Sequence, residues 1–102
     1  MALVSYSKQA LRDFERHFEF LAKDDASLAG AVVSAITGAV SVLARHPEIG
    51  RSAEQDLREL IISRGRTGYV ALYRYNDVTD SVLVLAIRHQ KEAGYQSSSG
   101  EI

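Results

Sequence analysis

Basic side chains able to bind phosphate or carboxylate groups gather in the second half of the chain. They are Arg58, Arg64, Arg66, Arg74, Arg88, His89 and Lys91. The planar guanidinium of arginine donates two parallel hydrogen bonds to such oxygens. Acidic residues are interleaved with this set, at Glu59, Asp77, Asp80 and Glu92. Taken alone, the set therefore favours a solvated surface over a binding site.

His89 is the residue best placed for proton transfer, because it follows the apolar run Val82–Ile87 at the end of a predicted strand. A histidine held by a rigid strand can act as a general acid or base. Tyr69, Tyr73 and Tyr75 could stack on nucleic-acid bases. The residues alone favour simpler roles, a hydrogen-bonded surface histidine and the half-buried aromatic face of a sheet.

The sequence contains no motif for metal binding or thiol chemistry. The chain has no cysteine, which excludes disulfides, thiolate metal sites and a cysteine nucleophile. His17 and His46 are far from His89 in sequence and give no metal-ligand spacing. The loop His46–Arg51 is explained by Pro47 and Gly50 ending a helix. We therefore expect no metal and no cofactor.

Length and composition indicate one packed domain. The chain has 102 residues, 46% hydrophobic residues and a formal net charge of −1. This balance argues against disorder and against a protein that coats nucleic acid or anionic membranes by bulk charge. Met1–Arg16 contains no apolar signal core, so we expect a cytoplasmic protein that has no contact with membranes.

The first elements are predicted to be a short strand and an amphipathic helix. Ala2–Ser5 is compatible with a strand, and Ser7 is a suitable N-cap for a helix from Lys8 to about Lys23. Apolar residues recur at helical spacing along this segment. They are Leu11, Phe14, Phe18 and Leu21.

A second helix is predicted from about Ala26 to Arg45, capped by the Asp24–Asp25 pair. Ala26–Ala44 carries no charge, so a membrane span is the alternative. Its many small residues and the lack of an aromatic belt favour a buried helix. We expect Gly30, Ser34 and Gly38 to contact the first helix. The opposite face would cover a sheet through Val33, Ile36, Val40 and Leu43.

Three further segments are predicted to be strands, at Leu57–Ser63, Tyr69–Tyr75 and Val82–Ile87. The six consecutive apolar residues of the last predict a central strand covered on both faces. The order β-α-α-β-β-β predicts an α+β fold, with a two-helix antiparallel hairpin packed on one face of a small antiparallel sheet. We expect one domain over residues 1–95, followed by a flexible tail over 96–102.

Five segments, taken in order, resemble the RelE/ParE superfamily of bacterial type II toxin–antitoxin toxins. The resemblance spans about Val4 to Tyr95. The segments are Ala10–Phe14, Leu43–Arg51, Leu57–Leu60, Gly68–Arg74 and Val84–Tyr95. The superfamily has the fold predicted above.

The resemblance implies a growth-inhibiting toxin that is neutralised by a cognate antitoxin. It also implies that operator DNA is contacted only indirectly, through the antitoxin. RelE-like members cut messenger RNA on the ribosome with basic residues on the sheet. ParE-like members, the branch of plasmid stabilisation proteins, lack that set and bind DNA gyrase.

In an alignment with the RelE-type pattern, three positions that are basic in RelE-like members carry other residues in this chain. Glu59 and Ile61 stand where the ribonucleases have lysines, and Val70 stands where an arginine follows the Gly-Tyr pair. His89 replaces a catalytic arginine, although Tyr95 matches the terminal tyrosine. Because an apolar side chain cannot neutralise a developing phosphorane charge, we expect a ParE-like, non-catalytic toxin with gyrase as its target.

We expect the target to be bound by the end of the last strand, at Arg88, His89 and Lys91, with Arg58 and Arg74 as secondary candidates. The alternative is a ribosome-dependent endoribonuclease. In it His89 would be the acid or base, Tyr95 an orienting or proton-transfer group, and Arg88 a phosphate clamp. A third possibility is an inactive toxin fold that acts only as an antitoxin-binding and repression partner.

Overall fold

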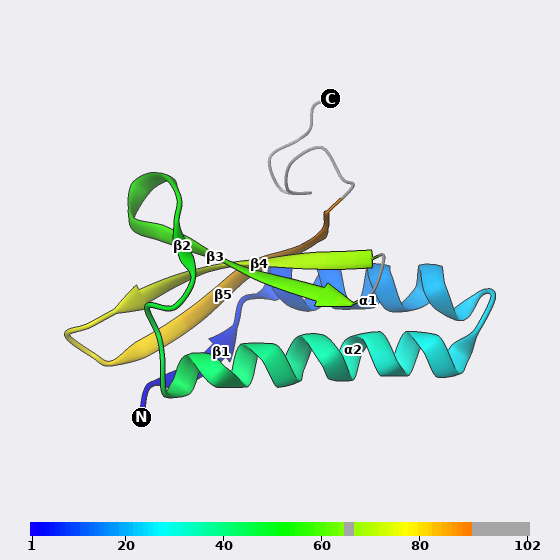
Figure 1. The fold of residues 1–102 in the computed structure, drawn as a ribbon, viewed down its shortest axis with the longest axis horizontal. Coiled ribbons are helices and arrows are strands. Elements are labelled where there is room, and N and C mark those ends of the chain that lie inside the picture. Colours follow the sequence, from blue (N-terminus) through cyan, green and yellow to red (C-terminus); the bar gives the residue numbers. More distant parts are fainter. Residues whose placement is uncertain (65–66, 91–102) are drawn as a thin grey trace.

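A computed structural model describes residues 1–64 and 67–90. The elements in chain order are β1 (Leu3–Tyr6), α1 (Lys8–Ala22), α2 (Ala26–Ser41), the 3₁₀ turn η1 (Val42–Ala44), β2 (Arg51–Ser52), the 3₁₀ turn η2 (Glu54–Asp56), β3 (Leu57–Arg64), β4 (Thr67–Asn76) and β5 (Ser81–His89). The predicted α+β class and element order are confirmed (Figure 1). The predicted tail over 96–102, Lys91 and Tyr95 lie outside the described residues.

The strands form one five-stranded sheet in the order β1-β5-β4-β3-β2. The meander β3-β4-β5 is antiparallel, as predicted. The sheet is mixed, because β1 pairs parallel to β5, with Tyr6 opposite Val84. The expected central, doubly covered position of Val82–Ile87 is wrong. β4 holds the centre, and Leu83 on β5 is 37% exposed. Its apolar run reflects a side of β5 that no helix covers among the described residues.

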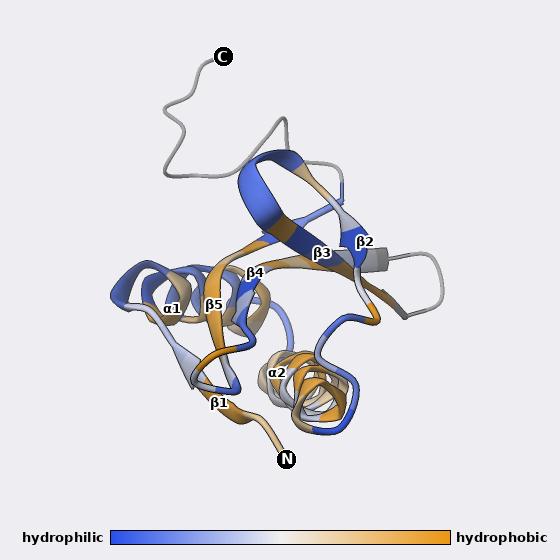
Figure 2. Ribbon diagram, turned by 90° about the vertical axis from the view of Figure 1, so that its left-hand side faces the viewer, coloured by the Kyte–Doolittle hydropathy of each residue, from blue (hydrophilic) through white to orange (hydrophobic). Residues whose placement is uncertain are grey.

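α2 lies below β3 and β4, whereas α1 runs beside β5, as Figure 2 shows. Both predicted N-caps are confirmed. The Ser7 hydroxyl accepts from the Ala10 N–H at 3.0 Å, and the Asp25 carboxylate accepts from the Leu28 N–H at 3.1 Å. These bonds satisfy amide groups that a helix start leaves without a partner. We call the sheet face toward the helices the helix side and the other the open face.

The buried side of α1 differs from the predicted apolar stripe. Leu11 and Phe18 are 53% and 40% exposed, and Phe14 and Leu21 are only partly buried. The residues buried on α1 are Ala10, Asp13 and His17. The prediction of Leu11 and Phe18 was wrong because polar side chains of α1 take the positions nearest β5.

The buried side of α2 is formed by Ala29, Val32, Ile36 and Val40, followed by Leu43 in η1. Ile36, Val40 and Leu43 are as predicted, whereas Val32 takes the place expected for Val33.

The expected contact of Gly30, Ser34 and Gly38 with α1 is wrong, because all three are exposed. Ser34 lies two residues from both Val32 and Ile36, about 200° around the helix from the buried row. Ala26–Ala44 is long and apolar enough for a membrane span by length and composition. Val32, Ile36, Val40 and Leu43 of this segment instead pack in the hydrophobic core beside the sheet.

A β-bulge lies in β5. Tyr73 is opposite Val84, but Leu72 is opposite Ala86, so Leu85 is an extra residue. Side chains alternate between the two faces of a strand, and one extra residue reverses which of them face the helices. The main core contains Val82, Val84 and Ile87, whereas Ala86 is buried outside it. The bulge therefore determines the directions of the last residues of β5.

Candidate functional site

The end of β5, the main predicted site, places its two basic residues on opposite faces. Arg88 is paired with Val70 and His89 with Tyr69. Tyr69 belongs to the core on the helix side, whereas Val70 is buried outside that core. Arg88 therefore lies on the open face and His89 on the helix side. A regular strand would have placed them the other way round.

His89 packs against an aromatic stack on the helix side. Its ring contacts the Tyr69 ring edge-to-face, with 5.1 Å between centroids, and Tyr69 contacts the ring of His17 at the same distance. Tyr69 and Tyr73 are 4% and 0% exposed. Stacking on bases is therefore excluded for these two tyrosines, and their interpretation as a buried aromatic face is confirmed.

Asp13 and His17 reach the end of β5 from α1, which the sequence did not predict. An oxygen of the Asp13 carboxylate accepts the Ile87 N–H at 2.8 Å, and His17 Nε2 lies 3.2 Å from the Ile87 carbonyl oxygen. Both side chains are buried. The available signal was two polar residues four positions apart beside Phe14, because that spacing places them on one helix face.

The open face combines an apolar middle with arginines on both sides of it. Arg74 is exposed and paired with Leu83, while Arg88 is paired with Val70. Four residues of β4 separate these two positions, which corresponds to ~13 Å. Leu72 and Ala86 lie between them. Near the β2 edge, Arg51 contacts the Glu59 carboxylate at 2.9 Å.

Arg58 lies apart from the other predicted binding residues. It is paired with Tyr73 and so points to the helix side. Its Nη1 donates to the carbonyl oxygens of Glu48 and Gly50, at 3.1 and 2.8 Å. The Tyr73 hydroxyl accepts the Gly50 N–H at 2.9 Å. These bonds fasten the loop that follows η1 to the sheet.

The hydroxyl of Tyr73 has an altered affinity for its proton. Burial raises the pKa of Tyr73 above the ordinary value of 10.0, while the Gly50 hydrogen bond and the Arg58 charge offset part of the rise. Tyr73 therefore stays neutral at physiological pH. Its hydroxyl serves as an acceptor in the loop contact.

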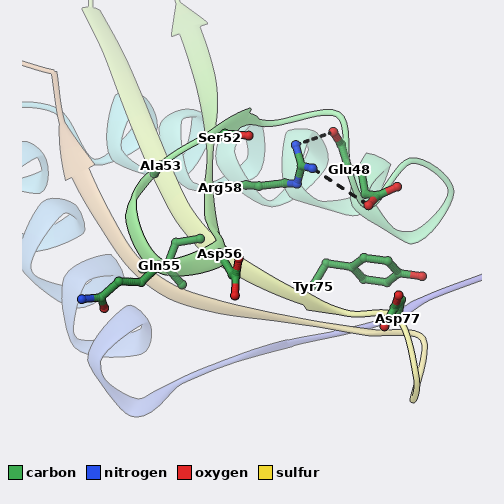
Figure 3. A pocket seen from close by; sticks show the side chains of 9 residues that line it. Glu48, Ser52, Ala53, Gln55, Asp56, Arg58, Tyr75 and Asp77 are labelled. Atoms are coloured by element: carbon green, nitrogen blue, oxygen red, sulfur yellow. Dashed lines mark hydrogen bonds and ion pairs between the residues drawn. The ribbon is translucent and has the colours of Figure 1, made fainter.

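A hollow of about 720 Å³ lies next to this loop. Figure 3 shows Glu48, Asp56, Arg58, Tyr75 and Asp77 around it. Three of these five side chains are carboxylates, so the hollow disfavours phosphate. Within residues 1–64 and 67–90, no group of three His, Asp or Glu side chains could hold a metal ion. Among the predicted binding residues that the structure describes, only Arg58 lines the hollow.

The fold and this distribution of charged groups define a small α+β protein with a partly apolar sheet face. The sequence model described as "ParE toxin of type II toxin-antitoxin system, parDE" matches residues 4–94. The chain is also 34% identical over 92 residues to Toxin RelE3 of Caulobacter vibrioides, covering 90% of this chain and 98% of the relative. The protein therefore belongs to the ParE toxin family within the RelE/ParE superfamily.

Solved structures agree in fold. The chromosomal ParDE system of P. aeruginosa matches with a TM-score of 0.70 at 20% identity, covering 85% of this chain and 94% of that one. The toxin–antitoxin complex RelBE2 of Mycobacterium tuberculosis matches with a TM-score of 0.54 at 27% identity, covering 87% and 98%. The predicted superfamily is confirmed, and both of its branches are represented among these relatives.

Proposed function

We propose that the protein inhibits bacterial growth by binding DNA gyrase. The observation that carries this proposal is that the open face has no basic side chain at the three positions where RelE-like ribonucleases hold basic residues. The register places Glu59, Ile61 and Val70 together on that face. Val70 is also buried. No side chain at these positions can stabilise the negative charge that develops on a phosphate under attack.

The same face suits a protein partner. Interfaces commonly combine an apolar middle with arginine near its border. Ile61 and Leu83 are exposed and Leu72 is half-buried on this face, and these three supply the apolar part. Arg74 and Arg88 lie near its border. We assign Arg88 and Arg74 as the primary contacts. His89 and Lys91, which the sequence predicted as primary contacts, become secondary candidates here, and Arg58 stays one. Lys91 lies outside the described residues.

We further propose a cognate antitoxin as the neutralising partner, acting in the cytoplasm. Several relatives of known structure are toxin–antitoxin systems or complexes. Large apolar side chains on the surface of this chain are of the kind that a partner would cover. They include Leu3, Leu11, Phe20 and Leu83. Contact with operator DNA would then be made by the antitoxin.

The test is supercoiling by purified gyrase in the presence of the free toxin. We expect inhibition by the wild-type toxin, and Arg88→Ala should weaken it about tenfold. Arg12→Ala is the matched control, because Arg12 is exposed on α1 and hydrogen-bonds only to Gln9 among the described residues. It should inhibit like the wild type. No inhibition at any toxin concentration would remove gyrase as the target.

The second candidate is a ribosome-dependent endoribonuclease. It is favoured by the 34% identity to a toxin named RelE3 and by a half-buried histidine at the end of β5. Against it, a general acid or base and a phosphate clamp must converge on one phosphate, and His89 and Arg88 point to opposite faces. Toxin-dependent cuts in translated messages, lost in His89→Ala, would support this candidate over gyrase binding.

A further inference from the structure

β5 continues past the end of its neighbour β1. The pairing of the two strands ends at Tyr6 and Val84, whereas β5 runs on to His89. The backbone groups on this edge of β5 would then lack a partner strand. Buried N–H and C=O groups without a hydrogen bond are costly, so something must replace the strand.

Side chains from the start of α1 take the place of the missing strand. The Ser7 hydroxyl donates to the Leu85 carbonyl oxygen at 3.0 Å. Asp13 accepts the N–H of Ile87, and His17 contacts the carbonyl oxygen of the same residue. Because a carbonyl oxygen only accepts, this hydrogen bond requires the tautomer of His17 with the proton on Nε2. The guanidinium of Arg16 also lies 3.5 Å from this Nε2 atom. The residue directly before Arg88 is thus held at both of its backbone groups.

The Asp13 carboxylate is itself held in one orientation. Its side chain is 1% exposed. Gln9 Nε2 donates to the second carboxylate oxygen at 2.9 Å, and Arg16 Nη2 lies 3.6 Å from it. A buried carboxylate without such partners would be strongly unfavourable. This arrangement fixes the acceptor that receives the Ile87 N–H.

We propose that Asp13 and His17 are positioning residues for the end of β5 that contacts the target. They fix the peptide groups of Ile87, and strand alternation then directs Arg88 to the open face and His89 onto Tyr69. His17 contributes a second time, because its ring packs edge-to-face against Tyr69, the ring that also contacts His89. This inference rests on the proposed function, in which Arg88 and His89 lie at the binding end.

The experiment compares variants that remove these bonds with variants that keep them. Asp13→Ala and His17→Ala remove the acceptor and the donor. Asp13→Asn retains an oxygen that can accept, and His17→Gln retains an N–H at nearly the same distance from the backbone. Val40→Ala is the control. Val40 is a buried core residue of α2, so its loss lowers stability without removing a hydrogen bond to Ile87.

Three quantities are measured on the free toxin: thermal stability, amide hydrogen exchange at Ile87 and Arg88, and inhibition of gyrase. For Asp13→Ala we expect exchange at Ile87 to rise about tenfold beyond the rise at core amides. Inhibition of gyrase by Asp13→Ala should be about tenfold weaker than inhibition by Val40→Ala, after correction for the loss of stability in each variant. The Asn and Gln variants should recover most of both effects.

Inhibition that follows stability alone, equally in Asp13→Ala and Val40→Ala, would overturn the positioning role. Unchanged exchange at Ile87 would overturn it as well. The exchange measurement needs no target, so it tests the inference separately from the proposed function. If the wild type fails to inhibit gyrase while Ile87 exchange responds as expected, the failure belongs to gyrase as the target.

Discussion

Two regions of the sheet, here called the His89 end and the loop end, hold neighbouring backbone with side chains, but they use different groups. At the His89 end, Asp13 and His17 of a helix bind one residue of a strand. At the other end, Arg58 and Tyr73 of two strands bind a loop at Glu48 and Gly50. In one case a helix supports a strand, and in the other the strands support a loop.

The difference shows why the basic residues of the sequence are not equivalent. Arg58 directs its guanidinium at carbonyl oxygens of its own chain. At the His89 end a carboxylate and an imidazole hold the backbone, and Arg88 Nη1 lies 3.4 Å from the carbonyl oxygen of the neighbouring His89. Arg88 therefore contacts the end of its own strand, whereas Arg58 contacts a separate loop. The type of residue is the same at both ends, and the neighbouring element decides its use.

The largest expected effect is at the His89 end. Asp13→Ala should lower the free energy of unfolding by about 3 kcal/mol, because it removes a charged hydrogen bond and leaves the buried Ile87 N–H without an acceptor. Urea denaturation measures the change. Asp24→Ala, at an exposed carboxylate between the helices, is the control and should stay within about 0.5 kcal/mol. Equal losses in both would contradict the assigned role.

Gly50→Ala tests the loop end. A Cβ at this position would lie 2.7 Å from the Tyr73 hydroxyl oxygen and 2.8 Å from the Glu59 carbonyl oxygen. We expect a loss of about 2 kcal/mol from this overpacking. Gly38→Ala is the matched control, since its Cβ would meet nothing within 4 Å. On the exposed face of α2 it should raise stability by about 0.5–1 kcal/mol. The opposite ranking would show that the loop can move without cost.

Tyr73→Phe isolates one bond of the loop end. It should cost about 1 kcal/mol at neutral pH, because the buried Gly50 N–H loses its acceptor. The pKa of Tyr73 is raised in the folded state above 10.0, so the unfolded chain releases this proton first as the pH rises. Wild-type stability should therefore fall from about pH 10 toward the higher pKa of the folded state.

The variant should lose less stability over that alkaline range than the wild type. Tyr6 and Tyr75 also have raised pKa values and are present in both proteins. The decline should therefore be shallower in Tyr73→Phe and still measurable. Thermal unfolding at several pH values measures it, and identical slopes would mean that Tyr73 does not contribute.

The smallest effect is expected outside both ends. The Arg51–Glu59 pair is 2.9 Å long, but the Arg51 side chain is 62% exposed. A double-mutant cycle with Arg51→Ala and Glu59→Ala should give a coupling of about 0.5 kcal/mol. High salt should reduce it, because exposed charges are screened. A coupling as large as the Asp13 effect would remove the contrast between structural and surface charges.

The sequence predicted features with local causes. The caps at Ser7 and Asp25 and the buried row through Ile36 and Val40 depend on residue type and helical spacing. Val82–Ile87 predicted a strand but could not predict the bulge, because six consecutive apolar residues have no alternation from which to read a face. The superfamily was predicted from the resemblance.

The parts of the site that were not predicted depend on tertiary contacts. Asp13 and His17 matter only because β1 ends before β5 does, which is a property of two strand lengths and their register. Nothing in the local sequence of Arg58 and Arg88 shows that the first contacts a loop and the second lies on the open face. The small residues Gly30, Ser34 and Gly38 of α2 were expected to contact α1, but all three are exposed.

The bulge at Leu85 determines which side chain at the end of β5 lies on the open face. In a regular strand of the same sequence, Arg88 and His89 would exchange faces, whereas loss of Leu85 would remove the bulge and leave both on their present faces. Two toxins could then share the same letters at the end of this strand and offer a target a cation in one case and an imidazole in the other. Target preference in such a fold can change through a bulge in a strand before any change in its chemistry.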